Sequence, residues 1–186
     1  RASFYFGSIS KTVTIPNKIS FYKYNAVDSN ALIYGGKTQK ALADFTAISD
    51  ASFDLEIAGV THTIVTDLTS AVSFADIALL IQTQIQLETD TQFATATVSF
   101  NATRGSFDLI SGDTGTASIS VVAGTSGTSI VDLIEWNASA ILSDGLVSQT
   151  ITENLNASVD VSTNFATFLY TPVFTVTSKI EVAQWA

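Results

Sequence analysis

The sequence contains no cysteine, no methionine, one histidine and two prolines among its 186 residues. The absence of cysteine excludes a disulfide framework and any cysteine-ligated zinc or iron–sulfur site. One histidine is too few for a histidine-based metal centre. No apolar run approaches the roughly 20 residues that span a bilayer, so we expect no membrane insertion. What is present, 46% hydrophobic and 13% charged residues, is typical of a globular chain with a sizeable core.

Basic residues are few and unevenly distributed. Eight Lys and Arg stand against 17 Asp and Glu, a formal net charge of −9, and six of the eight lie within residues 1–40. This scarcity argues against nucleic-acid binding. The split between a basic start and an acidic remainder favours head-to-tail contacts between copies of the chain. We therefore take Lys11, Lys18 and Lys23 as candidate subunit-contact residues, with a solvated basic strand edge as the alternative.

Alternating aromatic and β-branched residues predict strands at the start of the chain. They cover residues 2–9, 12–15 and 18–24. Gly35-Gly36 then marks a break, after which Ala, Thr, Ser and Asp become frequent.

A weak internal repeat organises the middle of the chain. The letters SFDL begin two alternating runs, at residues 52–59 and 106–112, and second runs follow at 61–65 and 117–122. Each pair leads to a predicted helix start, and the whole pattern predicts strand–strand–helix twice with an added strand at 96–100. Chance similarity between short strands is the alternative.

The two predicted helix starts have the spacing of a capping box. Ser73 and Ser129 each precede an aspartate by three positions. The first helix presents one apolar face, formed by Phe74, Ile77, Ala78, Ile81 and Ile85, and the second is short, ending near Trp136.

The last part of the chain changes again. Helical spacing of apolar residues predicts a helix over residues 152–169 with Thr152 as its cap, then a strand at 172–176 and a helix from Thr177 that is cut off at the end of the sequence. We expect an α+β fragment of a longer protein. Residues 1–38 and 146–186 form a discontinuous layered α/β body, and residues 39–145 form a β-rich module inserted into it.

No motif in the sequence predicts catalysis. His62 lies in an alternating run and is interpreted as a packed or edge residue, because acid–base work needs an orienting partner. Asp50, Asp54, Asp108 and Asp113 lie near predicted strand ends, but without a calcium-binding loop pattern. The tripeptide Asp-Thr-Gly at 113–115 has no second copy and is interpreted as chance. We predict no catalytic residue, no cofactor and no metal site.

Several segments together resemble tail sheath proteins of contractile-tailed bacteriophages. The stretch 40–59 resembles the opening of the inserted module in these proteins, and the SFDL strand at 106–112, the glycine-rich turn, ILSDG at 141–145, TENL at 152–155 and residues 180–186 continue the likeness. The strand–strand–helix module is also similar to inserted modules of flagellin-like proteins.

The resemblance implies a structural subunit of the virion rather than an enzyme. Such a subunit would self-assemble in stacked rings around the tail tube protein in the host cytoplasm, and the sheath would contract on infection. A surface adhesin or flagellin-like filament subunit is the alternative.

Overall fold

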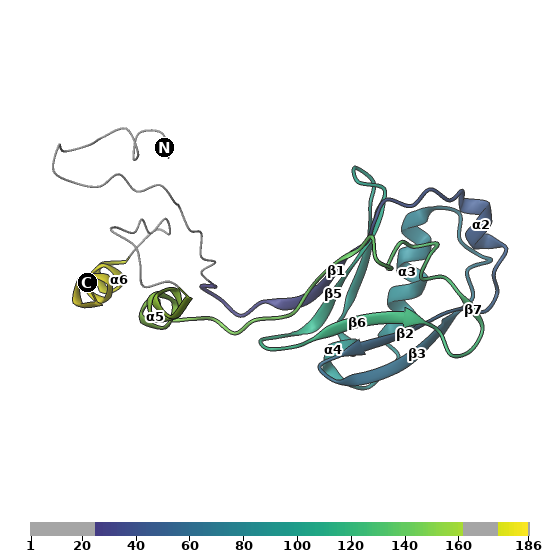
Figure 1. Ribbon diagram of the computed structural model, residues 1–186. Coiled ribbons are helices and arrows are strands. Elements are labelled where there is room, and N and C mark those ends of the chain that lie inside the picture. Colours follow the sequence, from purple (N-terminus) through teal and green to yellow (C-terminus); the bar gives the residue numbers. More distant parts are fainter. Residues whose placement is uncertain (1–24, 162–174, 186) are drawn as a thin grey trace. The chain divides into compact units, whose positions relative to one another are not determined.

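The computed structural model describes residues 25–161 and 175–185 (Figure 1). The chain divides into two units. One is the continuous segment Val27–Ser148, called here the compact unit. The described parts of the other are residues 25–26, 149–161 and 175–185. The strands predicted within residues 2–24 lie outside the described residues.

The compact unit contains two sheets, which confirms the predicted α+β class. The first sheet, called sheet A, is antiparallel with the order β4-β5-β1-β8, formed by Thr97–Asn101, Ser106–Thr114, Asn30–Tyr34 and Ile141–Ser143. The second has the order β3-β2-β6, formed by Val60–Thr66, Ala51–Ile57 and Ile119–Ala123, and the short β7 (Thr128–Ser129) runs parallel to β2. The strands predicted around 52–65 and 96–100 correspond to β2, β3 and β4.

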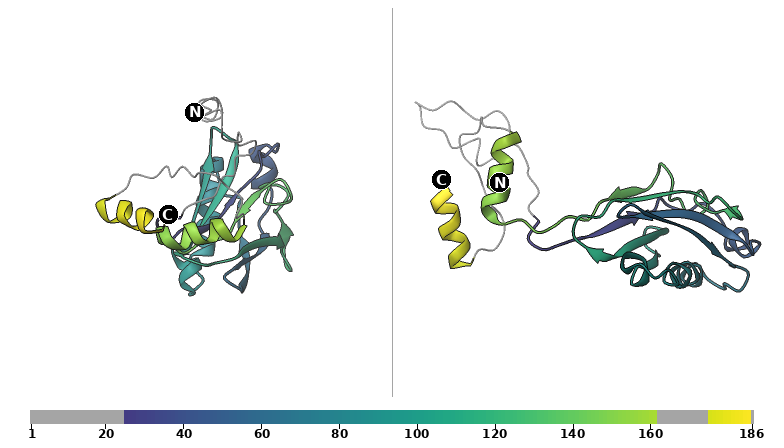
Figure 2. Two further views of the ribbon diagram at one scale, coloured as in Figure 1. Left: turned by 60° about the vertical axis from the view of Figure 1, so that its left-hand side comes forward. Right: turned by 90° about the horizontal axis from the view of Figure 1, so that it is seen from below.

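Three helices belong to this unit: α2 (Leu42–Thr46), α3 (Phe74–Ile85) and α4 (Thr91–Ala94). The predicted start of α3 is confirmed, because the Ser73 hydroxyl accepts a hydrogen bond from the Asp76 backbone. The predicted apolar face is also confirmed, since Ile77, Ala78, Ile81 and Ile85 are buried. This helix, seen end-on in Figure 2, contacts both β3 and β4.

Gln82 of α3 and Gln86, the residue that caps the end of this helix, bond to β4 and to the residue just before it. Val98 N donates to Gln82 Oε1 at 2.9 Å, and Gln86 Nε2 donates to the Ala96 carbonyl at 2.7 Å. The amphipathic pattern alone places these glutamines opposite the apolar face. Here they satisfy backbone groups along the edge of sheet A.

Aromatic rings fill the core between the sheets and α3. Phe45, Phe74, Phe100 and Phe107 form a cluster with ring centroids 4.9–6.1 Å apart. Phe53 meets Trp136 edge to face at 5.4 Å. Contacts of this kind add about 0.5–1.5 kcal/mol per pair to the burial of the rings.

Strand β1 is a structural element that the sequence pattern did not predict. It pairs with β5 on one side and β8 on the other, and Ala31 and Ile33 are completely buried. The strand precedes residue 39 but belongs to the compact unit.

The prediction of a second strand–strand–helix unit is wrong in two respects. Strands β5 and β6 lie in different sheets, whereas β2 and β3 form a hairpin. Residues 131–135 form a turn and not a helix. Glu135 has a positive φ of 56°, which ends any helical path after one turn, and burial of Ile130, Ile134 and Trp136 holds the turn in place.

The described helices of the other unit are α5 (Ile151–Val161) and α6 (Val176–Trp185), which contact each other. Thr150, rather than the predicted Thr152, caps α5, because it exchanges hydrogen bonds with Glu153. Val176, predicted to end a strand, is the first residue of α6, where the Thr175 hydroxyl accepts a bond from Ser178 N. Residues 162–169 of the predicted helix lie outside the described part.

Candidate subunit-contact surface

The predicted contact residues Lys11, Lys18 and Lys23 lie outside the described residues. The candidate surface is therefore built here from the compact unit. Two features of that unit bear on assembly: the way its two ends leave it, and the position of its few cations.

The incoming and outgoing segments of the compact unit run side by side. Ser29 N donates to the Leu146 carbonyl at 2.8 Å, and Leu146 N donates back to Ser29 Oγ at 3.1 Å. Ser148 N donates to Asp28 Oδ1 at 2.6 Å, and this backbone hydrogen bond lowers the pKa of Asp28 from its ordinary value. A compact unit whose two ends are joined in this way has the connectivity of an inserted domain.

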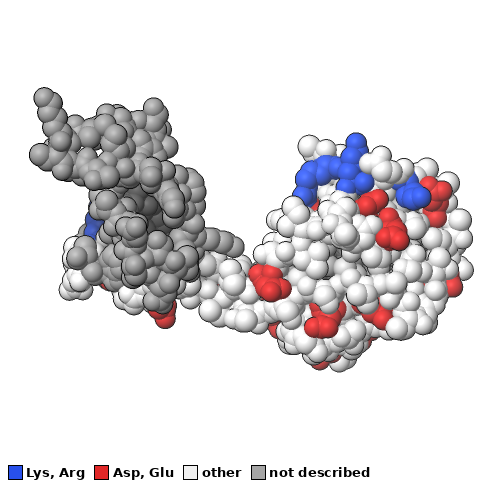
Figure 3. All heavy atoms as spheres, viewed as in Figure 1, with Lys and Arg blue, Asp and Glu red and all other residues white. Residues whose placement is uncertain are grey.

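The cations of the compact unit gather far from this connection. Within residues 27–148, Lys37, Lys40 and Arg104 are the only Lys or Arg, against fourteen Asp and Glu. Figure 3 shows Lys and Arg side chains along one edge of the unit, whereas acidic side chains are dispersed over the visible face. Strand β5 begins beside Arg104 and ends beside the connection, where Gly115 N donates to the Ser29 carbonyl at 3.0 Å. Nine residues of extended strand separate the two by roughly 25–30 Å.

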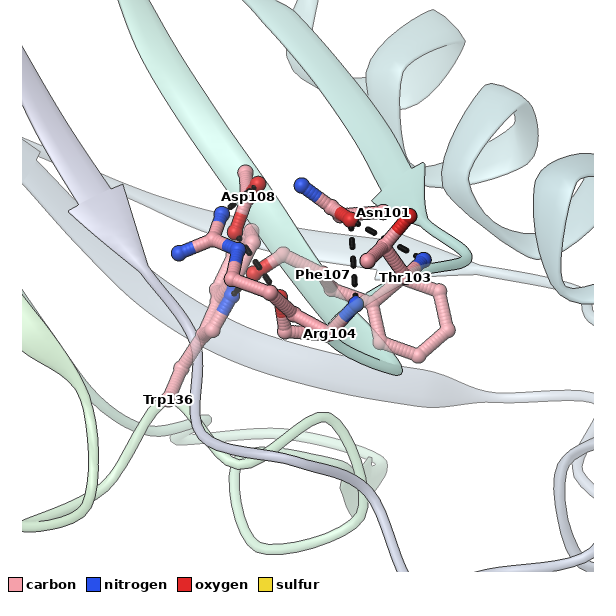
Figure 4. A network of polar contacts seen from close by, with 7 residues as sticks. Asn101, Thr103, Arg104, Phe107, Asp108 and Trp136 are labelled. Atoms are coloured by element: carbon pink, nitrogen blue, oxygen red, sulfur yellow. Dashed lines mark hydrogen bonds and ion pairs between the residues drawn. The ribbon is translucent and has the colours of Figure 1, made fainter.

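Arg104 is held in a fixed position by the β4–β5 turn and by the outer face of sheet A. Asn101 Oδ1 accepts hydrogen bonds from the backbones of Thr103 and Arg104, both at 3.1 Å, which shape the turn (Figure 4). The guanidinium group then forms an ion pair with Asp108 and lies 4.7 Å from the centre of the Tyr34 ring. The Asp108 side chain is 9% exposed and that of Arg104 is 42% exposed, so the pair presents a cation to solvent while covering a carboxylate.

The strand behind this network is anchored by Trp136. Its indole nitrogen donates to the Phe107 carbonyl at 2.9 Å (Figure 4). The same oxygen accepts from Gly35 N at 3.0 Å. A Cβ at Gly35 would lie 2.4 Å from that oxygen, so the chain passes close to β5 only with glycine here. The break predicted at Gly35-Gly36 is thus the point where the chain leaves β1 and begins the segment that carries Lys37 and Lys40.

His62 contacts two carboxylates and an aromatic ring, which the sequence did not predict. Its two ring nitrogens lie 2.9 Å from Glu88 Oε2 and 2.8 Å from Asp90 Oδ2, and its ring meets Phe93 edge to face at 4.7 Å. These contacts join β3 to the segment between α3 and α4, so His62 has the character of a structural clamp.

Three of the four aspartates considered for calcium, Asp54, Asp108 and Asp113, have separate local partners. Asp54 accepts from the backbone of Thr125, Asp108 binds Arg104, and Asp113 accepts from the Thr91 hydroxyl at 2.6 Å. In residues 25–161 and 175–185, no three His, Cys, Asp or Glu residues are grouped as metal ligands would be. None of the helices in these ranges combines the length and apolar character needed to cross a bilayer.

Sequence reasoning missed the cluster formed by Tyr34, Lys37 and Arg104. One signal was present, because Arg104 is an isolated cation in an acidic stretch. Its partners come from strands that are far apart in the chain, and no local pattern specifies that β1 lies beside β5.

Comparison with known proteins points to the same compact unit. The family model described as "E217 tail sheath protein gp31, insert domain" matches residues 28–151, about two thirds of the chain. A search of curated proteins found no match. The matched range begins and ends within a few residues of the compact unit Val27–Ser148. The tail sheath is a structural component of the bacteriophage virion, and this chain belongs to the tail sheath insert-domain family.

Proposed function

We propose that this chain is part of a contractile tail sheath subunit that assembles with copies of itself in stacked rings around the tail tube protein. The sheath shortens during infection, while each subunit remains folded and exchanges contacts with its neighbours. The observation that carries the proposal is the match of a sheath insert domain to a unit whose ends run side by side, Ser29 N to the Leu146 carbonyl at 2.8 Å.

The same observation supports different roles for two parts of the subunit. The compact unit is the insertion, and the segments before Val27 and after Ser148 contribute to one discontinuous body. We place the boundaries at these residues rather than at 38/39 and 145/146, because β1 and the Asp28–Ser148 bond belong to the compact unit. The body contributes assembly contacts through Lys11, Lys18 and Lys23.

The subunit works by packing and has no catalytic role, cofactor or nucleic-acid ligand. It is assembled in the bacterial host cytoplasm and functions in the virion. Asp54, Asp113 and His62 support this proposal, since each of these side chains is engaged with a neighbouring residue of the fold.

Electron microscopy of the complete gene product, expressed with and without its tail tube protein, tests the function. Hollow striated tubes are expected, and reversal of Lys11, Lys18 and Lys23 to Glu should abolish them while the circular dichroism spectrum is unchanged. Thin filaments, or only monomers in the presence of tube protein, would refute a sheath role and favour the adhesin or flagellin-like alternative.

A further inference from the structure

The outer face of sheet A carries exposed apolar side chains. Residues Ile33 and Leu109 point into the core and are completely buried, so the residues next to them in β1 and β5 point outward. On that outer face, Tyr34 is 37% exposed, Ile110 42% and Ile141 66%. Strand register places Tyr34 opposite Ile141, and Leu32 opposite Ile110. These side chains form one continuous apolar stripe across three strands.

Cations border this stripe at one end. The Arg104 guanidinium lies over the Tyr34 ring and is fixed there by Asp108, so it loses little conformational entropy on binding a partner. Lys37 lies beside it, because Thr38 N bonds to the Gly105 carbonyl at 2.9 Å. An apolar centre with Tyr and Arg and a charged rim is the composition of protein–protein interfaces.

The charge of the unit limits what this surface attracts. With three cations against fourteen acids in residues 27–148, two copies repel each other in most orientations. The basic edge is where one copy attracts the acidic surface of another. Such a contact is heterologous, because unlike surfaces meet, and heterologous contacts generate rings and helical arrays.

We propose that the outer face of sheet A, formed by Tyr34, Ile110 and Ile141 and bordered by Lys37 and Arg104, is a contact surface for an acidic face of a second copy of the chain, with Lys40 three residues beyond Lys37 in the same segment. The inference rests on the proposed function and deepens it by naming a surface on the insert domain. The contact is weak between isolated chains and becomes effective in the sheath, where neighbouring copies are held at high effective concentration.

A first test uses the 186-residue chain alone. Unlabelled and ¹⁵N-labelled chains are mixed at about 1 mM, treated with a zero-length carbodiimide that joins Lys to carboxylates, and analysed by mass spectrometry. Links between differently labelled chains are expected at Lys37 and Lys40 in low salt, with at least a tenfold decrease in 0.5 M salt as the charges are screened. An absence of such links overturns the proposal.

The variants avoid Arg104, whose loss leaves the nearly buried Asp108 without its cation. Ile141→Asp places a charge in the stripe and should reduce the links at least tenfold. Leu79→Asp is the matched control, since Leu79 is 57% exposed on α3 and lies outside the stripe. It should change the links less than twofold. Equal effects of the two variants overturn the proposal, as does an unchanged yield with Ile141→Asp.

A second test separates this inference from the sheath function. In the complete gene product, Lys37→Glu with Lys40→Glu should raise the concentration needed for tube formation at least tenfold, whereas Leu79→Asp should not. Tubes that form from the double variant at the wild-type concentration refute the contact and leave the sheath function standing. If no wild-type tubes form but the inter-chain links persist, the function fails and the contact stands.

Discussion

Replacing Trp136 with Phe should destabilise the compact unit by an amount that the structure allows us to estimate. Trp136 is 1% exposed and its indole donates a hydrogen bond to the Phe107 carbonyl. That oxygen keeps the bond from Gly35 N, so no buried acceptor is orphaned, and the lost bond costs about 1 kcal/mol. The smaller phenyl ring lowers the free energy of unfolding further, by about 1–2 kcal/mol. This amount lies between the cost of removing one buried methylene and the cost of truncating an aromatic side chain to Ala.

The total for Trp136→Phe is therefore about 2–3 kcal/mol, which corresponds to a decrease of roughly 5–15 °C in the Tm of the compact unit. Urea and thermal unfolding followed by far-UV circular dichroism measure it without relying on the altered tryptophan. Tyr34→Phe is the control, because it removes one hydroxyl from a partly exposed ring and should change stability by less than about 0.5 kcal/mol. A Trp136→Phe protein as stable as wild type would refute the anchoring of the 131–135 turn by this residue.

Three further predictions follow from other contacts. His62→Ala should lower the free energy of unfolding by about 1–2 kcal/mol, measured in urea, because it removes two carboxylate contacts and an edge-to-face ring contact. The hydrogen bond from Ser148 lowers the pKa of Asp28, so its stabilisation is complete above the ordinary pKa of about 3.9 and is lost as the pH falls through the folded value. The Ser148 amide NMR shift should follow this titration, and Asp28→Asn should eliminate it. Gly124→Ala should cost more than about 2 kcal/mol, because its Cβ would lie 2.9 Å from a backbone nitrogen of β2, whereas Gly59→Ala meets no atom within 4 Å and costs about 1 kcal/mol through its positive φ.

Each of these expectations has a result that would contradict it. Wild-type stability of His62→Ala would show that the carboxylate contacts contribute nothing net. A Ser148 amide shift that is flat between pH 6 and pH 2 would remove the role assigned to Asp28. For the glycine pair, equal stability losses would mean that the close approach at Gly124 relaxes freely.

The parts of the fold that were predicted correctly are those with strong local patterns. The β2–β3 hairpin alternates over its whole length, and α3 combines a capping serine at Ser73 with an apolar face at helical spacing. The predicted cap of α5 was off by two residues because Thr150 and Thr152 are both followed by helical spacing, and only Thr150 has a glutamate three positions later.

The parts that were missed depend on partners far away in the chain. Strand β1 has only five residues, and its burial comes from β5 and β8, more than seventy residues downstream. The SFDL similarity of β2 and β5 is real in the sequence, yet β5 pairs with β4 and β1 while its sequence neighbour β6 joins β2. Alternation indicates that a segment is a strand but does not specify its neighbours.

The same non-local pairing explains why the charge split seen in the sequence was only partly informative. Counting along the chain assigns Lys37 and Lys40 to a basic first segment and Arg104 to an acidic remainder. Pairing of β1 with β5 brings Tyr34 opposite Asp108, and the turn that follows β4 then places Arg104 over the Tyr34 ring. In the folded unit the three cations lie along one edge, and the remaining charged residues are acidic (Figure 3). The length of β5 separates that edge from the connection at Ser29 and Leu146. In the contact proposed above, the attractive charges of the compact unit therefore lie at the opposite end of β5 from the Ser29–Leu146 connection, and that end meets the acidic face of the second copy.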